Sequence, residues 1–252
     1  MGVTARYRAL LDWLLTLDLP NVYLSHRENR GRDTCAFRLA LNSILGLPPY
    51  HVGPDGRVRG DPHGFTHVFI LNSSVRGPFL PLYYSEPWYW PFLQPLLVAP
   101  EAGSLLAASL AGRRASMVGS YGSCEQQAHL QSMSLMLGVR DLNELMDLID
   151  CFDQDTYARA VGSEIGISQR LLEHQTALVP LLYGLAGHAL GSDPECNAKL
   201  NPHVAGRYFG GDTTPHDVVF VKNSGEMQRQ GLLADSVAHQ TELYTCKNQV
   251  EI

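Results

Sequence analysis

The longest continuous stretch with helical spacing of apolar residues runs from residue 123 to residue 190. Leu130, Met133 and Leu137 recur at intervals of three and four residues, which would place them on one face of a helix. Ser123 stands where an N-cap is expected, because its side chain can accept a hydrogen bond from a free backbone N–H. The pattern therefore predicts that the central part of the chain begins with a helix.

The same stretch contains two further helical patterns. Asp141 with Glu144 predicts the start of a second helix, and an apolar stripe beginning near Ser168 predicts a third. Pro180 interrupts the third pattern and predicts a kink, since proline removes one backbone hydrogen bond. His129 has polar neighbours, which predicts a solvent-facing side chain. We interpret the whole block as packed core without chemistry of its own.

Outside this block, capping and turn residues delimit shorter elements. A helix is predicted from Asp33 to a stop at Gly46, and a short one over residues 105–111. Strands are predicted over residues 66–71 and 218–221. The expected fold is α+β and helix-dominated, with the central helical block (about 123–190), a few short strands and an extended arm.

The length of the chain bears on its domain organisation. A chain of 252 residues is near the upper end of the size of one domain, and the sequence shows neither a linker nor an internal repeat. We therefore expect a single compact domain over residues 1–252. The alternative is two closely packed lobes, a mixed one over residues 1–118 and a mainly helical one over residues 119–252.

Residues 77–100 form the second informative stretch. Five prolines between Pro78 and Pro95 predict an extended arm rather than a regular helix or a central strand. The arm is also rich in aromatic rings, which dominate the energetics of protein interfaces. Such an arm either covers its own core or inserts into a neighbouring subunit. The candidate interface residues are Phe79, Tyr83, Tyr84, Trp88, Tyr89, Trp90 and Phe92.

Composition favours a role in assembly. Charged residues make up only 17% of the chain, below the roughly 25% of an average soluble domain. Lysine is scarce, and guanidinium, the prevailing cation here, is weakly hydrated and suits buried contacts. We therefore expect a structural or assembly subunit with oligomeric protein partners. A coat or coat-associated protein of a virus particle (virion, capsid) is one example.

Charge is unevenly distributed along the chain. Residues 1–76 contain 9 Arg against 6 acidic residues, a net charge of +3, whereas residues 77–252 carry a net charge of −9. A basic region favours an acidic partner such as RNA, and Arg27, Arg30 and Arg32 are the candidates for that contact. The region lacks the dense basic stripe with interleaved aromatic residues that is typical of nucleic-acid binders, so we rank RNA below protein partners.

Cysteine usage and the N-terminus indicate the compartment. The five cysteines are odd in number and scattered, without C-x-x-C spacing, which predicts reduced thiols and neither a disulfide framework nor a structural zinc. The N-terminal apolar run is short and contains Asp12 and Asp18, so we expect no signal peptide or membrane span. We expect a cytoplasmic or particle-enclosed protein that is not secreted and uses no metal or cofactor.

Cys35 is the candidate reactive side chain. It stands in the first turn of the helix predicted from Asp33, where free N–H groups and the helix dipole favour the thiolate. This segment resembles the cysteine box of papain-like peptidases and deubiquitinases. The resemblance implies a base at the start of a strand, for which His67 and His216 are candidates, and an orienting residue such as Asn223. A papain-like cysteine hydrolase is thus the alternative function, ranked below the non-enzymatic assembly role.

Overall fold

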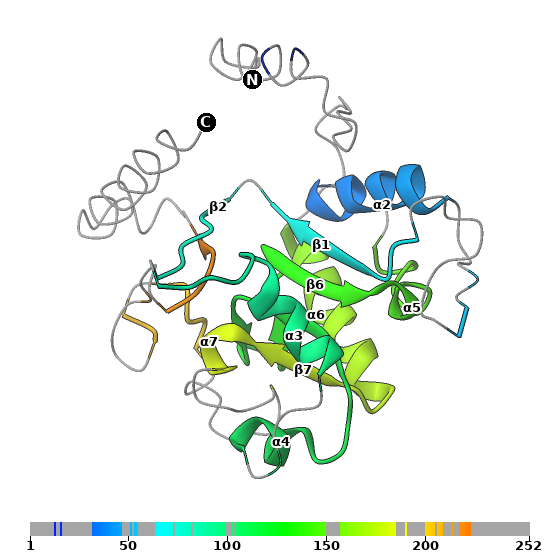
Figure 1. Ribbon diagram of the computed structural model, residues 1–252. Helices are drawn as coiled ribbons and strands as arrows, with labels where there is room; N and C mark the ends of the chain where they lie inside the picture. Colours follow the sequence, from blue (N-terminus) through cyan, green and yellow to red (C-terminus); the bar gives the residue numbers. More distant parts are fainter. Residues whose placement is uncertain are drawn as a thin grey trace.

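A computed structural model of the chain reveals a mixed α+β fold (Figure 1). The part of the chain that the structure describes comprises residues 13, 16, 32–46, 51, 53–54, 64–72, 74–81, 83–98, 102, 104–149, 157–184, 190, 200–204, 206–208, 213 and 217–222. Both helices and strands occur throughout these residues, so the expected dominance of helices is not confirmed.

A four-stranded mixed sheet in the order β1-β6-β3-β7 lies at the centre. Strand β6 runs antiparallel to both of its neighbours, whereas β3 and β7 run parallel to each other. Every residue of β3, β6 and β7 is buried, which gives these strands apolar or small residues at successive positions. The strands are β1 (His67–Leu71), β6 (Ser134–Gly138), β3 (Ala115–Gly119) and β7 (Ala177–Pro180).

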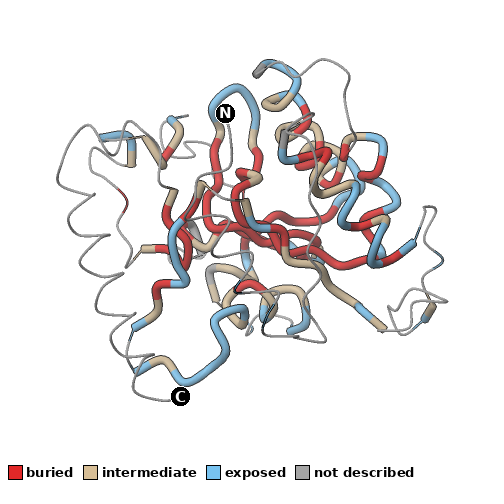
Figure 2. Tube along the Cα trace, turned by 90° about the horizontal axis from the view of Figure 1, so that it is seen from above, coloured by how far each residue is buried: buried red, intermediate tan, exposed pale blue. Residues whose placement is uncertain are grey.

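Helices cover both faces of this sheet. Helices α2 (Arg32–Leu45) and α6 (Tyr157–Glu173) pack on one face, and α3 (Trp90–Leu97) packs on the other. Neighbouring strand residues belong to different cores: Met117 packs with α2 and α6, whereas Val118 packs with α3. Figure 2 shows the buried residues concentrated in the sheet between the two helical layers.

The remaining elements are short and surround the sheet. Among the described residues are also two small two-stranded sheets, and three helices of one or two turns, of which α4 and α5 lie between strands of the central sheet and α7 follows its last strand. The three short helices are labelled in Figure 1. These elements are β2 (Val75–Arg76) with β8 (Val221–Lys222), β4 (Gly122–Ser123) with β5 (His129–Leu130), α4 (Leu105–Leu110), α5 (Val139–Leu142) and α7 (Leu181–Gly184).

The helix predicted to begin at Ser123 is wrong. The segment forms β4, β5 and β6, and the residues expected on one helical face divide between the two cores, with Leu130 and Leu137 on the α2 side and Met133 on the α3 side. A strand buried on both faces is apolar at successive positions, so residues three and four apart are apolar as well. Helical spacing alone therefore does not distinguish the two structures.

The other two predicted helices of the block also differ. The helix expected at Asp141 is only the short α5 followed by turns, because the chain leaves β6 and folds back at once. The third pattern contains the last turns of α6 and then β7. Pro180 is the last residue of β7, aligned with Gly119 of β3, so it ends a strand instead of bending a helix.

The proline-rich arm contains a helix, contrary to prediction. Helix α3 begins immediately before Pro91, which occupies a first-turn position where no backbone N–H is needed. Pro95 lies inside α3 and removes one internal hydrogen bond. Burial of Phe92 beneath the helix offsets that loss, since Phe92 is fully buried in the core on this face.

Strands from both halves of the sequence meet in the central sheet. Strand β1 pairs with β6. The boundary between the two lobes of the alternative division, after residue 118, lies inside β3 (Ala115–Gly119). In the described part of the chain, no helix has the length and apolar character needed to cross a membrane.

Candidate functional site

Cys35 lies in the first turn of α2, as predicted, but its thiol is not free. Cys35 is buried and disulfide-bonded, and the partly buried Cys124 is disulfide-bonded as well. The expectation that all cysteines are reduced is therefore wrong for these two. A nucleophilic cysteine acts as the thiolate, which a disulfide does not provide.

The predicted pairing of Cys35 with His67 does not form. Asn72, just after the end of β1, donates a hydrogen bond to Asp33 near the start of α2 (3.0 Å), whereas His67 is the first residue of β1. His67 and Asn72 are five residues apart along an extended strand, which separates their Cα atoms by ~16 Å. His216 and Asn223 lie outside the described residues. The residues that the structure describes thus do not assemble a papain-like site.

The aromatic arm divides into a buried and an exposed part. Phe79 and Phe92 are buried in the core beneath α3. Trp88 packs edge-on against Phe69, with ring centroids 5.1 Å apart, and against Phe220 at 5.6 Å. Phe79 and Phe92 therefore are not available to a neighbouring subunit, whereas Trp88 packs on the core and is still 37% exposed.

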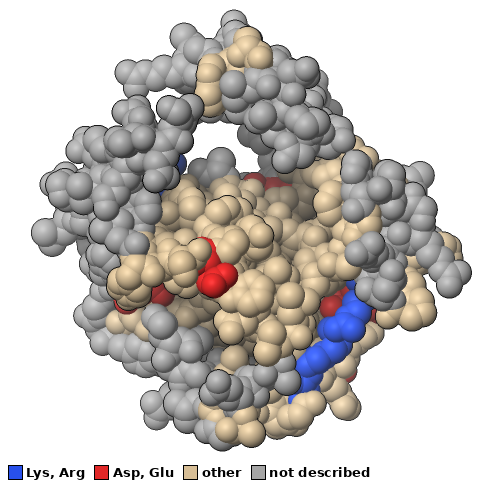
Figure 3. Space-filling view, viewed as in Figure 1, with Lys and Arg blue, Asp and Glu red and all other residues tan. Residues whose placement is uncertain are grey.

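The exposed part of the arm forms what we call the α3 surface, made of the exposed apolar side chains between residues 83 and 98. Tyr83 is 88% exposed, and Leu97 and Val98 at the end of α3 are 55% and 50% exposed. Trp88 and Tyr89 complete this surface, whereas Tyr84 and Trp90 are partly buried. Figure 3 shows that charged side chains are sparse among the described residues on this side of the molecule.

A cleft opens at the edge of the sheet where β1 begins and β6 ends. Its volume is about 510 Å³, within the range of small-ligand sites. Its polar and charged lining residues come from β1, β3, α5 or the residues directly before them and are Thr66, His67, Arg114, Ser116, Arg140 and Asp141. Leu96 and Leu97 at the end of α3 form an apolar wall.

The charges in this cleft are unequal. The Arg114 guanidinium donates two hydrogen bonds to Asp141, at 3.0 Å and 2.5 Å, and the Asp141 side chain is only 8% exposed. Arg140 is 52% exposed, and its Nε lies 3.9 Å from the same carboxylate. Burial and the positive charge of Arg140 together lower the pKa of His67, against the opposing effect of Asp141. The cleft therefore holds more positive than negative charge.

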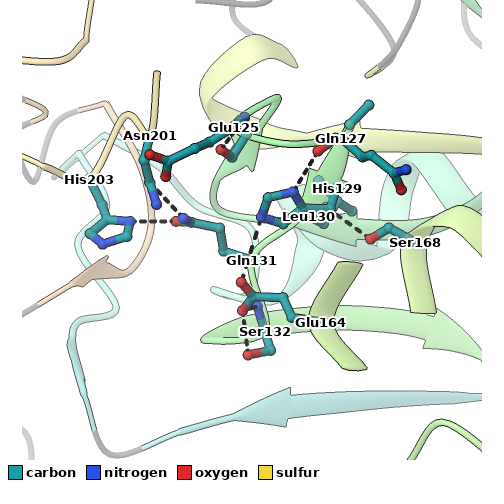
Figure 4. A network of polar contacts seen from close by, with 12 residues as sticks. Glu125, Gln127, His129, Leu130, Gln131, Ser132, Glu164, Ser168, Asn201 and His203 are labelled. Carbon is teal, nitrogen blue, oxygen red and sulfur yellow. Dashed lines mark hydrogen bonds and ion pairs between the residues drawn. The ribbon is translucent and has the colours of Figure 1, made fainter. Parts of the chain in front are cut away.

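A second polar cluster lies at the other end of β6 and is partly buried (Figure 4). The backbone N–H and the hydroxyl of Ser132 both donate to Glu164 of α6, at 2.7 Å and 2.6 Å. His129 of β5 is only 4% exposed, and its Nε2 lies 3.6 Å from Glu164. The prediction that His129 faces solvent is thus wrong. Alongside Glu164, Ser168 accepts a bond from Leu130 N–H, so α6 anchors the β4–β5 hairpin.

The pKa values in this cluster follow its hydrogen bonds. Burial alone would lower the pKa of His129, but the Glu164 carboxylate and the Gln127 carbonyl (2.7 Å from Nδ1) raise it overall. Burial would likewise raise the pKa of Glu164, but His129 and Ser132 lower it overall. The pair is therefore a stabilised imidazolium–carboxylate pair.

A neutral chain of side chains continues from this pair. His203 hydrogen-bonds through Nδ1 to Gln131 Oε1 (2.8 Å), and the Gln131 amide donates to Asn201 Oδ1 (2.7 Å; Figure 4). Burial and the charge of Lys222 lower the pKa of His203 to about 4, so its imidazole is uncharged at neutral pH.

The second polar cluster lacks the order of a nucleophilic triad. In a triad the histidine lies between the hydroxyl and the acid, where it accepts the hydroxyl proton. Here Glu164 lies between Ser132 and His129, and the Ser132 hydroxyl is bonded to the carboxylate. The arrangement connects a helix, a hairpin and a loop, and we assign it to stability.

Sequence reasoning singled out His67, as a partner of Cys35, but missed the charged residues of both clusters. Asp141 was interpreted as a helix cap, and Arg114, Arg140 and Glu164 carried no motif. Their only sequence signal is the presence of charge beside segments that are otherwise apolar. A charge at the end of a buried strand is at the rim of the sheet, where such residues from different strands meet.

The candidate RNA-contacting arginines lie outside the described residues or at their boundary. Arg27 and Arg30 lie outside the described residues, and Arg32 is described only as the first residue of α2. Within the described residues, no three His, Cys, Asp or Glu side chains gather closely enough to hold a metal ion.

Comparison with known proteins leaves the site to be judged on its own chemistry. No protein-family model, no curated protein and no solved structure matches this chain.

Proposed function

We propose that the protein is an assembly subunit that associates with a second copy of its own chain through the α3 surface. The observation that carries the proposal is the exposure of large apolar side chains along residues 83–98, with Tyr83 exposed by 88% and Leu97 by 55%. Apolar area removed from water on association contributes roughly 25 cal/mol per Å² before the costs of binding are subtracted.

The charge of this segment favours a second copy over a charged partner. In a symmetric dimer the same patch occurs on both subunits, so a strongly charged patch would repel itself. Residues 83–98 contain a single charged residue, Glu86. A surface of aromatic and aliphatic side chains with one charge is compatible with itself, and aromatic residues are frequent at the energetic centres of interfaces.

The proposed interface is smaller than the sequence alone indicates. Phe79 and Phe92 are excluded because they belong to the chain's own core. The contact surface is therefore the set of exposed side chains Tyr83, Trp88, Tyr89, Leu97 and Val98. A coat or coat-associated particle is one setting in which such a contact would repeat.

Sedimentation velocity of the full chain at micromolar to submillimolar concentration tests the proposal. We expect a reversible dimer or a larger species. The double variant Tyr83→Ser/Leu97→Ser should weaken association by at least about tenfold, the effect of losing one moderately strong contact. Trp88 is left unchanged because its ring packs on the core.

Leu39→Ser is the matched control, since Leu39 is also an exposed leucine (45%) but lies on α2, across the sheet. It should leave association unchanged. A strictly monomeric native chain would overturn the proposal, as would equal weakening by Leu39→Ser and the double variant.

A further inference from the structure

The cleft at the end of β6 has an unbalanced set of charges that the assembly role does not use. Arg114 and Asp141 neutralise each other through two hydrogen bonds. Arg140 shares the same carboxylate, but only at 3.9 Å, beyond hydrogen-bond distance. One carboxylate therefore faces two guanidinium groups, and the excess positive charge is carried by the more exposed one.

His67 faces the same space from the start of β1. Its Nδ1 lies 2.9 Å from the Thr66 hydroxyl, which leaves Nε2 as the ring nitrogen not engaged by Thr66. The charged groups that act on this ring are Arg140 and Asp141, with Arg114 in the same lining. An anion placed beside Arg140 would thus also be beside a nitrogen donor.

The other walls of the cleft are apolar. Pro54, Leu96, Leu97 and Ala115 line it, and its volume of about 510 Å³ exceeds that of an inorganic ion. Apolar walls with a few convergent polar groups are typical of sites for small organic ligands.

We propose that this cleft binds a small organic anion, whose carboxylate or phosphate group pairs with Arg140 and lies within hydrogen-bonding reach of His67. Arg140 supplies a planar fork of donors that matches either group. Asp141 holds Arg114 in place, and Leu96 of α3 covers the apolar part of the ligand, while the exposed Leu97 remains part of the α3 surface.

Titration of the full chain with sodium phosphate, acetate and benzoate, followed by NMR of the His67 ring protons, tests the proposal. Ionic strength is held constant, with sodium chloride as the reference titration up to about 50 mM. We expect a saturable shift of the His67 ring protons with phosphate or with the carboxylates but not with chloride. The anion that gives this shift identifies the charged group of the ligand as a phosphate or a carboxylate. Benzoate should bind more tightly than acetate because it also fills the apolar walls.

Arg140→Gln should weaken binding at least about tenfold, while Arg140→Lys, which keeps the charge but not the fork, should lie between it and the native chain. Arg170→Gln is the control, because Arg170 lies on α6 in an exposed pair with Asp147. Binding should also raise the pKa of His67, since a nearby anion stabilises the imidazolium.

Several outcomes would overturn the proposal. These are a shift that chloride reproduces, no saturation by any of the three anions, equal binding by acetate and benzoate, or unchanged binding in Arg140→Gln. Self-association is measured separately by sedimentation, so a failure here leaves the assembly proposal intact.

Discussion

The two charged clusters of this protein lie at opposite ends of β6 and differ in how their charges are matched. At the start of the strand, Glu164 receives two bonds from Ser132 and faces one imidazolium, that of His129. At its end, Asp141 faces two guanidinium groups beside an open cleft. The cations differ in exposure: the His129 side chain is 5% exposed and has a carboxylate to itself, whereas the two guanidinium groups that share Asp141 reach solvent, so the excess positive charge beside the cleft is available to a ligand.

Access to water explains the difference. A buried charge without a partner costs several kcal/mol, so unbalanced charge inside the fold would prevent folding. In the cleft, the Arg114 and Arg140 side chains are 41% and 52% exposed, and water compensates for the missing counter-charge. The following tests separate the two roles, beginning with the largest expected change in stability.

Glu164→Gln should give the largest effect. The amide still accepts the bonds from Ser132, but the charge that stabilises the His129 imidazolium is lost. We expect the free energy of unfolding at pH 6 to fall by about 2 kcal/mol in urea denaturation. The pKa of His129, measured by NMR, should fall as well.

Asp147→Asn is the control for this prediction, because it removes an exposed carboxylate that pairs with Arg170. Arg170 lies on α6, the helix that also carries Glu164. It should change stability by less than about 0.5 kcal/mol. Equal losses in the two variants would mean that burial does not distinguish the pairs.

The pH dependence of stability is the second test. His203 has a pKa of about 4 in the folded protein, below the value of 6.5 in the unfolded chain. Between these values the unfolded chain binds more protons, so stability should decrease as pH falls from 6.5, on the order of 1 kcal/mol per pH unit. His203→Asn should reduce this slope. An unchanged slope would mean that His203 is not the source of the pH dependence.

The ion pair between His129 and Glu164 gives a different profile. The pKa of His129 is raised in the folded protein, so its contribution is complete below 6.5 and is lost as pH rises through the folded value. The pKa of Glu164 is lowered, so its contribution is present above 4.5 and is lost as pH falls through the folded value. In Glu164→Gln, the loss of stability relative to the native chain should therefore be greatest between these limits.

Asp141→Asn should have a smaller effect than Glu164→Gln. The variant loses the charge that faces Arg114, but that guanidinium is 41% exposed and reaches water. We expect a loss of about 1 kcal/mol in urea denaturation. A loss as large as that of Glu164→Gln would show that the cleft is enclosed in solution.

Arg140→Gln should have the smallest effect on stability, within about 0.5 kcal/mol, because the side chain is half exposed and makes no close ion pair. Thermal unfolding of this variant checks that any loss of anion binding is not a loss of fold. A large destabilisation would instead assign Arg140 to the structure.

Local sequence signals located several elements correctly. The predicted helix beginning near Asp33 is α2, and it ends before Gly46, whose φ of +81° is the left-handed conformation expected there. The predicted strand over residues 66–71 is β1, and the short helix predicted over residues 105–111 is α4. Caps and helix-ending glycines act within a few residues of chain, so a single sequence contains the information.

The same reasoning failed where burial controls the structure. Ser134–Gly138 is apolar because it is enclosed by helices on both faces, and no local signal separates such a strand from a buried helix. His129 has polar neighbours in sequence, yet it is enclosed by α6. The aromatic arm was located correctly, but which rings face the core depends on where α3 docks.

By itself, the sequence determined where α2, α4 and β1 lie and located an aromatic, proline-rich segment over residues 77–100, because these follow from local backbone preferences and composition. The tertiary structure alone decided that the central block contains strands and that Arg140, Asp141, Arg114 and His67 share one cleft. Pairing of β6 with β1 and β3 brings these distant residues to the same edge of the sheet, and strand pairing depends on contacts between segments far apart in the chain.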